Sequence, residues 1–124
     1  MTEAPARSVS LAIPPKPDYI VLARLALSAI CRLTPLQPDD VADLKLAVSE
    51  VATERLTTAS EEPVRLEFEL EDDRLVVDVH AASAPAGSED ELSRAIVEAT
   101  VDEVIYNESS VRLVKRLPDS GPEA

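Results

Sequence analysis

Glycine is nearly absent from this chain, and its absence constrains the possible folds and sites more than any other feature. The 124 residues include only two glycines, Gly87 and Gly121, and the second lies close to the C-terminal end. A loop that wraps phosphate groups with backbone N–H groups needs positions that reach positive φ and allow close approach. Neither a P-loop nor a G-x-G-x-x-G turn fits this sequence. The sequence therefore argues against a glycine-loop nucleotide site.

The composition predicts a small domain with an aliphatic core and an acidic surface. Hydrophobic residues make up 45% of the chain, whereas aromatic residues make up only 2%. The formal net charge of −12 repels phosphate backbones and argues against direct binding to nucleic acid. The scarcity of aromatic rings also removes the stacking platforms that single-strand binders use. The acidic surface is compatible with a basic protein partner, and equally with solubility alone.

Cysteine and histidine usage limits the metal and disulfide chemistry that we expect. Cys31 is the only cysteine and His80 is the only histidine, which excludes an internal disulfide and any zinc site built on a pair of these residues. His80 ends a predicted strand on the face that carries Asp78, and we interpret it as a surface residue beside a carboxylate. We predict no metal site.

The N-terminus lacks the pattern of a secretory signal, and no apolar run approaches the roughly 18 residues of a membrane span. The sequence therefore predicts a cytoplasmic protein without membrane contact.

Hydrophobic periodicity predicts the order β-α-α-β-β-α-β-β. Alternating apolar residues predict strands at 8–13, 64–70, 75–79, 101–106 and 111–117. Apolar residues at helical spacing predict helices at 17–33 and 40–58, and a third helix that starts near Glu89 and carries Leu92, Ile96 and Ala99. We expect an α+β fold, a two-layer α/β sandwich in which three helices cover one face of a mostly antiparallel sheet. Residues 8–117 would form this single domain, residues 81–88 a loop, and residues 1–7 and 118–124 flexible tails.

The first predicted helix is apolar on nearly all sides. We expect its core face to consist of Leu22, Leu25, Ala26, Ala29 and Leu33. The opposite side carries a stripe of Arg24, Ser28 and Arg32, which is flanked by Ile20, Val21, Leu27 and Cys31. A helix with two apolar sides is buried on more than one side, against another part of its own chain or against a partner protein. Both interpretations stay open, and the second would place an arginine, a residue enriched at binding hot spots, at the centre of the patch.

The second predicted helix has Val41, Leu44, Val48, Val51 and Ala52 on its inner face. Its polar face carries Asp43, Glu50 and Glu54. Carboxylates one turn apart can hold a metal ion or divide acid and base roles. They can also form a solvated polar face, which the absence of any other converging ligand favours.

Four segments together resemble the anti-sigma factor kinases of the RsbW and SpoIIAB type, members of the histidine kinase-like (GHKL) ATPase superfamily. These segments are LAIPPKPDYIVLARLALSAI at 11–30, DDVADLKLAVSEVATERL at 39–56, VDEVIY at 101–106 and VRLVKRL at 111–117. They occur in the order of the family, and the resemblance extends over residues 8–117. It implies the Bergerat-type fold of that superfamily, in agreement with the predicted order of elements.

The resemblance also implies that the nucleotide site has decayed. The N-box of the family is Glu-x-x-x-Asn; Glu50 matches its general base, whereas Glu54 replaces the magnesium-binding asparagine. The stretch from His80 to Pro85 lacks the aspartate and glycines of the adenine box. Glu91-Leu92-Ser93 stands where the family has its last glycine-rich turn, and the lid before it is shortened. We therefore expect a pseudokinase that binds ATP weakly or not at all and has no cofactor unless the degenerate site still holds ATP and magnesium, with Glu50 as a vestigial base.

The family members dimerise, sequester an alternative sigma factor and are released by an anti-anti-sigma (STAS) protein. The resemblance implies the same partners here, with no catalytic residue. Arg24 matches a partner-binding arginine of the family, and with it we expect Ile20, Val21, Leu27 and Ser28 to form the partner surface. Two other functions stay open. The chain could be a working serine kinase that phosphorylates its antagonist, or a scaffold that keeps the fold and binds a different protein.

Overall fold

The computed structural model describes residues 7–56, 61–81 and 91–118. Parts of several predicted segments lie outside the described residues. They are residues 1–6 and 119–124 of the predicted tails, residues 82–88 of the predicted loop, the start of the third helix near Glu89 and the end of the second helix at 57–58. The elements are β1 (Arg7–Ile13), the 3-10 turn η1 (Pro17–Tyr19), α1 (Ile20–Cys31), α2 (Pro38–Leu56), β2 (Val64–Leu70), β3 (Arg74–His80), α3 (Glu91–Thr100), β4 (Glu103–Tyr106) and β5 (Ser110–Arg116). Their order confirms the prediction.

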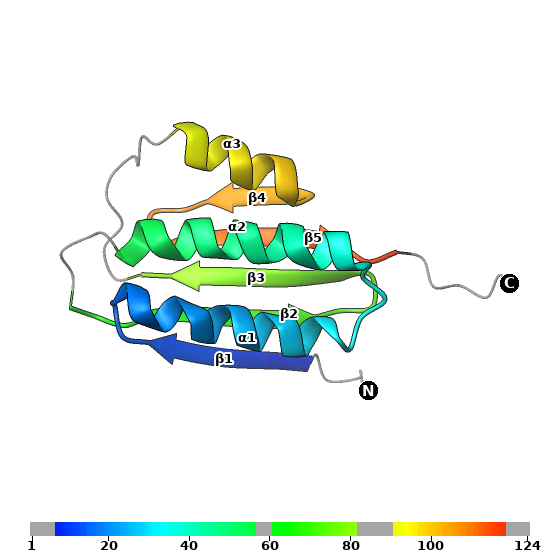
Figure 1. Cartoon of the computed structure of the whole chain (residues 1–124), viewed down its shortest axis with the longest axis horizontal. Coiled ribbons are helices and arrows are strands. Elements are labelled where there is room, and N and C mark those ends of the chain that lie inside the picture. The colour runs from blue at the N-terminus through cyan, green and yellow to red at the C-terminus, as the bar shows by residue number, and fades with distance from the viewer. Residues whose placement is uncertain (1–6, 57–60, 82–90, 119–124) are drawn as a thin grey trace, which may run out of the picture.

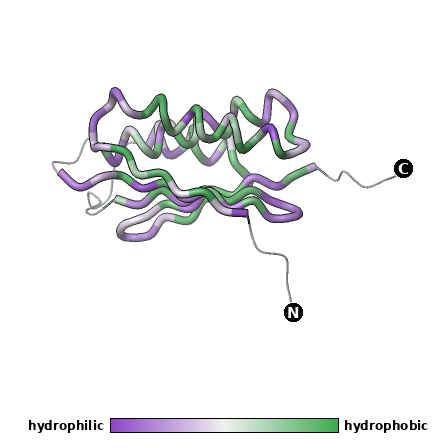
Figure 2. The backbone as a smooth tube through the Cα atoms, turned by 90° about the horizontal axis from the view of Figure 1, so that it is seen from below, coloured by the Kyte–Doolittle hydropathy of each residue, from purple (hydrophilic) through white to green (hydrophobic). Residues whose placement is uncertain are grey.

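The elements form two layers. The strands make one sheet in the order β1-β2-β3-β5-β4, and every neighbouring pair is antiparallel. All three helices lie on the same face of this sheet, roughly parallel to the strands (Figure 1). Viewed edge-on, the helices form one layer and the strands the other (Figure 2). The predicted α+β sandwich is confirmed, with a sheet that is antiparallel throughout.

The β2–β3 hairpin shows how the alternating sequence builds the sheet. In β2, Val64, Leu66, Phe68 and Leu70 are buried, whereas the residues between them are exposed or half-buried. Successive side chains of a strand point to opposite faces, so this alternation gives one face to the core and the other to solvent. The face away from the helices is therefore the polar face of the sheet.

The predicted core face of α1 is wrong. The residues of α1 that are buried are Ile20, Ala23, Leu27, Ile30 and Cys31. Leu22, Leu25 and Leu33, which we expected inside, are exposed. Because the helix is apolar on both sides, periodicity alone does not select a face, and packing against β1, β2 and α2 decides it. Small side chains such as Ala23 on the buried side allow this close packing.

The other two helices differ in how well the sequence predicted them. In α2, Leu44, Val48, Val51 and Ala52 are buried as predicted, and Val41 is half-buried. In α3, the buried residues are Ser93 and Val97, whereas the predicted Leu92 and Ala99 are exposed. Among the described residues, no helix has the length and apolar character needed to cross a membrane.

Candidate functional site

A hydrogen bond between α2 and α3 fixes the carboxylate that sequence reasoning singled out. Ser93 Oγ on α3 donates to Glu50 Oε1 on α2 across a distance of 2.8 Å. Ser93 is buried and Glu50 is half-buried, so the contact lies within the packed interface of the two helices. The serine of the segment that replaces the glycine-rich turn thus contacts the predicted vestigial base directly.

A second set of contacts surrounds the C-terminal end of α2. Glu54, one turn after Glu50, is half-buried, and the neighbouring Arg55 is buried. Burial lowers the pKa of the Arg55 guanidinium, and the charges of Glu54 and Tyr106 raise it by smaller amounts. On the adjacent elements, the Arg94 guanidinium lies 4.1 Å from the centre of the Tyr106 ring, a cation–π contact that joins α3 to β4. The position of α3 over this end of the fold is therefore fixed from two sides.

The chemistry available at this site is limited. Glu50 uses one acceptor position for Ser93 and keeps others, since a carboxylate accepts up to about four hydrogen bonds. Its neighbour Glu54 adds a second negative charge one helical turn away. Both glycines of the chain, Gly87 and Gly121, lie outside the described ranges, so no described residue is a glycine. The described backbone around Glu50 thus has no residue without a side chain for close approach to a phosphate.

The predicted partner residues on α1 divide into an exposed group and a buried group. Arg24 and Val21 are exposed and Ser28 is half-buried. Ile20 and Leu27 are only 7% and 0% exposed. These two were expected at the partner surface, and that expectation is wrong for their side chains, because they pack into the core between α1 and the rest of the fold.

The exposed side of α1 and the turn after it carry large apolar residues, most of which the sequence analysis placed in the core. We define the α1 patch as Val21, Leu22, Leu25 and Leu33, all of which are large and exposed. Sequence reasoning missed three of these four as surface residues. The available signal was the apolar character of the helix on both sides, which shows that two surfaces exist without saying which one faces the sheet.

Cys31, which sequence reasoning placed beside the arginine stripe, is buried at the end of α1. Burial raises the pKa of its thiol, and the nearby Lys45 lowers it by a smaller amount. The thiol is therefore held in its unreactive protonated form.

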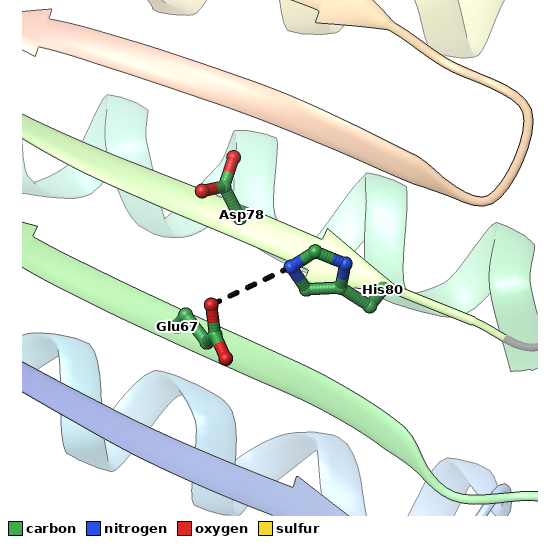
Figure 3. Close-up of side chains that lie close together, drawn as sticks. All are labelled: Glu67, Asp78 and His80. Atoms are coloured by element: carbon green, nitrogen blue, oxygen red, sulfur yellow. Dashed lines mark ion pairs between the residues drawn. The ribbon is translucent and has the colours of Figure 1, made fainter.

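A separate cluster lies on the polar face of the sheet, away from the helices. Glu67 on β2 and Asp78 and His80 on β3 each offer one ligand atom, and these atoms lie within 4.8 Å of one another (Figure 3). His80 Nε2 is 3.6 Å from Glu67 Oε1. Asp78 also pairs with Arg112 on β5, whose Nε lies 2.8 Å from Asp78 Oδ1. The sequence analysis linked His80 to Asp78 but missed Glu67, since only the register of the hairpin places it there.

Comparison with a family model shows the class of the protein. Residues 13–115 match the family model of the histidine kinase-like ATPase domain, and the chain belongs to this family. This match confirms the resemblance that the sequence motifs indicated.

Comparison with individual proteins gives more specific relatives. The chain is 33% identical over 75 residues to the serine-protein kinase RsbW of Listeria innocua, an alignment that covers 57% of this chain and 48% of the relative. It is 33% identical over 73 residues to the serine-protein kinase RsbW of Bacillus subtilis, covering 56% of this chain and 46% of the relative. The chain thus spans about half the length of these curated relatives.

A solved structure has the same fold. The crystal structure of the RsbU and RsbW domains of a Mycobacterium tuberculosis protein superposes with a TM-score of 0.76 at 17% identity. The superposition covers 92% of this chain and 33% of that chain. At this identity the comparison establishes the fold of the present chain.

Proposed function

We propose that this chain is a protein-binding regulator of the anti-sigma type that sequesters an alternative sigma factor without using ATP. The observation that carries this proposal is the α1 patch. Its four aliphatic side chains are between 41% and 63% exposed; three lie on α1, and Leu33 lies in the turn that follows it. Soluble proteins rarely leave a contiguous apolar surface uncovered unless it binds another molecule.

The charges beside the patch suit a protein partner. Arg24 and Arg32 are exposed, and each directly precedes an exposed leucine of the patch in the sequence. Arginine is enriched at interface hot spots because its planar guanidinium stacks and hydrogen bonds with a partner at low entropic cost. Arg24, Val21 and Ser28 therefore stay in the proposed partner surface, and the exposed leucines of the α1 patch join them.

The residues of α2 do not fit a magnesium–triphosphate complex as the family would hold it. Glu54 offers a carboxylate where a neutral amide is expected, and it lies one turn from the negative Glu50. Ser93 already occupies one acceptor position of Glu50. A triphosphate beside these two carboxylates would meet like charge, and the residues that the structure describes around Glu50 include no glycine to approach a phosphate closely. We therefore propose that neither ATP nor magnesium is a cofactor.

The remaining parts of the proposal follow from membership of the family. We propose that the chain forms a homodimer, acts in the cytoplasm in a partner-switching pathway such as a stress response, and is released by an anti-anti-sigma protein of the STAS type. The acidic surface, with its net charge of −12, supports direct contact with proteins rather than with nucleic acid.

A serine kinase is the second candidate function. It is favoured by the relatives, which are named serine-protein kinases, and by the retained Glu50. In that case Glu50 would act as general base for transfer of phosphate to a serine of the antagonist, and its hydrogen bond to Ser93 would have to break or be shared.

One experiment separates these functions. The full chain is mixed with each alternative sigma factor and each STAS-type protein of the source organism, with and without labelled Mg-ATP. We expect one sigma factor to be captured equally well in both conditions and no label to reach a STAS-type protein. Transfer of label would establish the kinase, and failure to capture any sigma factor would refute the anti-sigma role and favour a scaffold for another protein.

A further inference from the structure

We propose that Glu67, Asp78 and His80 form a binding site for a divalent transition-metal ion of the zinc type. The site lies on the polar face of the sheet, whereas Glu50 and the α1 patch lie in the helical layer on the other side (Figures 1 and 3). It is therefore independent of the proposed partner surface and of the decayed nucleotide site.

The register of the β2–β3 hairpin brings the three side chains together. Glu67 is the direct cross-strand partner of Asp78, and Arg65 is the partner of His80, so His80 lies diagonally across from Glu67 on the same face. Like charges directly opposite each other on neighbouring strands are destabilising. A cation held between Glu67 and Asp78 would remove this repulsion.

The imidazole supplies a second, independent observation. His80 Nε2 is shielded from solvent and has no hydrogen-bond partner among the residues that the structure describes. It points toward Glu67, but the distance of 3.6 Å to Oε1 is too long for a hydrogen bond (Figure 3). A shielded polar atom without a partner costs free energy, and coordination to a metal would compensate for that cost.

Arg112 is suited to orient the aspartate ligand. Its Nε and one terminal nitrogen donate to the two oxygens of Asp78 over 2.8 and 3.1 Å. Each carboxylate oxygen keeps a second lone pair, and ligating carboxylates are commonly hydrogen-bonded in this way by an outer residue. The guanidinium offsets one of the two carboxylate charges, so an added divalent cation still meets net negative charge.

The donor set selects the class of metal. One imidazole nitrogen and two carboxylate oxygens suit zinc and similar transition metals, whereas magnesium and calcium prefer oxygen ligands alone. The ligand atoms are within 4.8 Å of one another, so small side-chain rotations would bring each to a bond of about 2.0–2.2 Å. Three protein ligands would leave the remaining positions to water.

Calorimetric titration of tag-free full chain with ZnCl2 tests the site. We expect one zinc ion per chain, and we expect His80→Gln and Glu67→Gln each to weaken binding by at least about tenfold. Glu69→Gln is the matched control, because it removes the same charge from the same strand and the same face outside the cluster. We expect it to leave zinc affinity within about twofold, and we expect MgCl2 to give no comparable heat.

A measurement on the unmodified chain keeps the proposal testable if a variant fails to fold. Because His80 is the only histidine, all imidazole signals in a ¹H–¹⁵N NMR spectrum belong to it. We expect one equivalent of zinc to shift the Nε2 signal strongly. Three results would overturn the proposal. They are an imidazole signal that zinc does not shift, no zinc binding at concentrations up to about 0.1 mM, and a Glu69→Gln variant that weakens zinc binding as much as the cluster variants do.

Discussion

Leu27→Ala is expected to lower the free energy of unfolding by about 2–5 kcal/mol. Leu27 is fully buried on the side of α1 that packs into the core, so the truncation removes apolar burial and leaves a cavity. Leu25→Ala, two residues earlier on the same helix, is the matched control. Leu25 is 60% exposed, and its truncation is expected to change the stability by less than about 1 kcal/mol.

Urea denaturation followed by circular dichroism measures this difference. The two variants make the same chemical change in the same helix, so helix propensity contributes nearly equally to both. The slope of the unfolding free energy with urea should stay constant, and only the midpoint of Leu27→Ala should fall markedly. A larger loss of stability for Leu25→Ala would mean that α1 packs with its other face inward, which is the face that the sequence analysis expected in the core.

Leu25→Glu is expected to weaken capture of the sigma factor by about 30-fold or more. Truncating a residue at the centre of an interface costs roughly 2 kcal/mol or more, and burying a carboxylate in its place adds a desolvation cost. Each 1.4 kcal/mol or so corresponds to a tenfold change in the dissociation constant.

Arg24→Glu, at the edge of the same surface, is expected to weaken capture by about tenfold without unfolding the chain.

Leu92→Glu is the control for these binding measurements. Leu92 is a leucine of α3 and is 71% exposed, and α3 lies at the opposite edge of the helical layer from α1 (Figure 1). Leu92→Glu changes the net charge of the chain by the same amount as Leu25→Glu. It therefore measures how much of the loss of capture comes from long-range charge repulsion alone. If Leu92→Glu weakened capture as much as Leu25→Glu, or if Leu25→Glu had no effect, the α1 patch would not be the partner surface.

The sheet could be predicted from the sequence because the alternation of apolar and charged residues is compatible with only one orientation of each strand toward the core. In β2 the alternation of Leu66 and Phe68 with Glu67 and Glu69 places charge on one face only, and a shift by one residue would bury the charges. The pattern of α1 is compatible with two buried faces, because Leu25 and Leu27 belong to different apolar stripes of the helix. Contacts with other elements select between them, and a single helix does not contain that information.

The residues of the candidate sites also differ in how far the sequence alone predicts their position. Arg24 could be placed on the surface from the helix alone, because few arginines are buried without a partner. The contact between Glu50 and Ser93 joins residues 43 positions apart, and only the packing of α3 on α2 brings them together. Glu67 joins His80 through the hairpin register, which depends on the length of the turn between the two strands.

Calorimetric titration of the full chain with Mg-ATP tests most directly the claim that this member of the histidine kinase-like ATPase family works without nucleotide. The carboxylates Glu50 and Glu54 and the scarcity of glycine predict no saturable binding at concentrations up to about 1 mM, equivalent to a binding free energy weaker than about −4 kcal/mol. Saturable binding with a micromolar dissociation constant would contradict the account, because the site on α2 would then still hold a triphosphate.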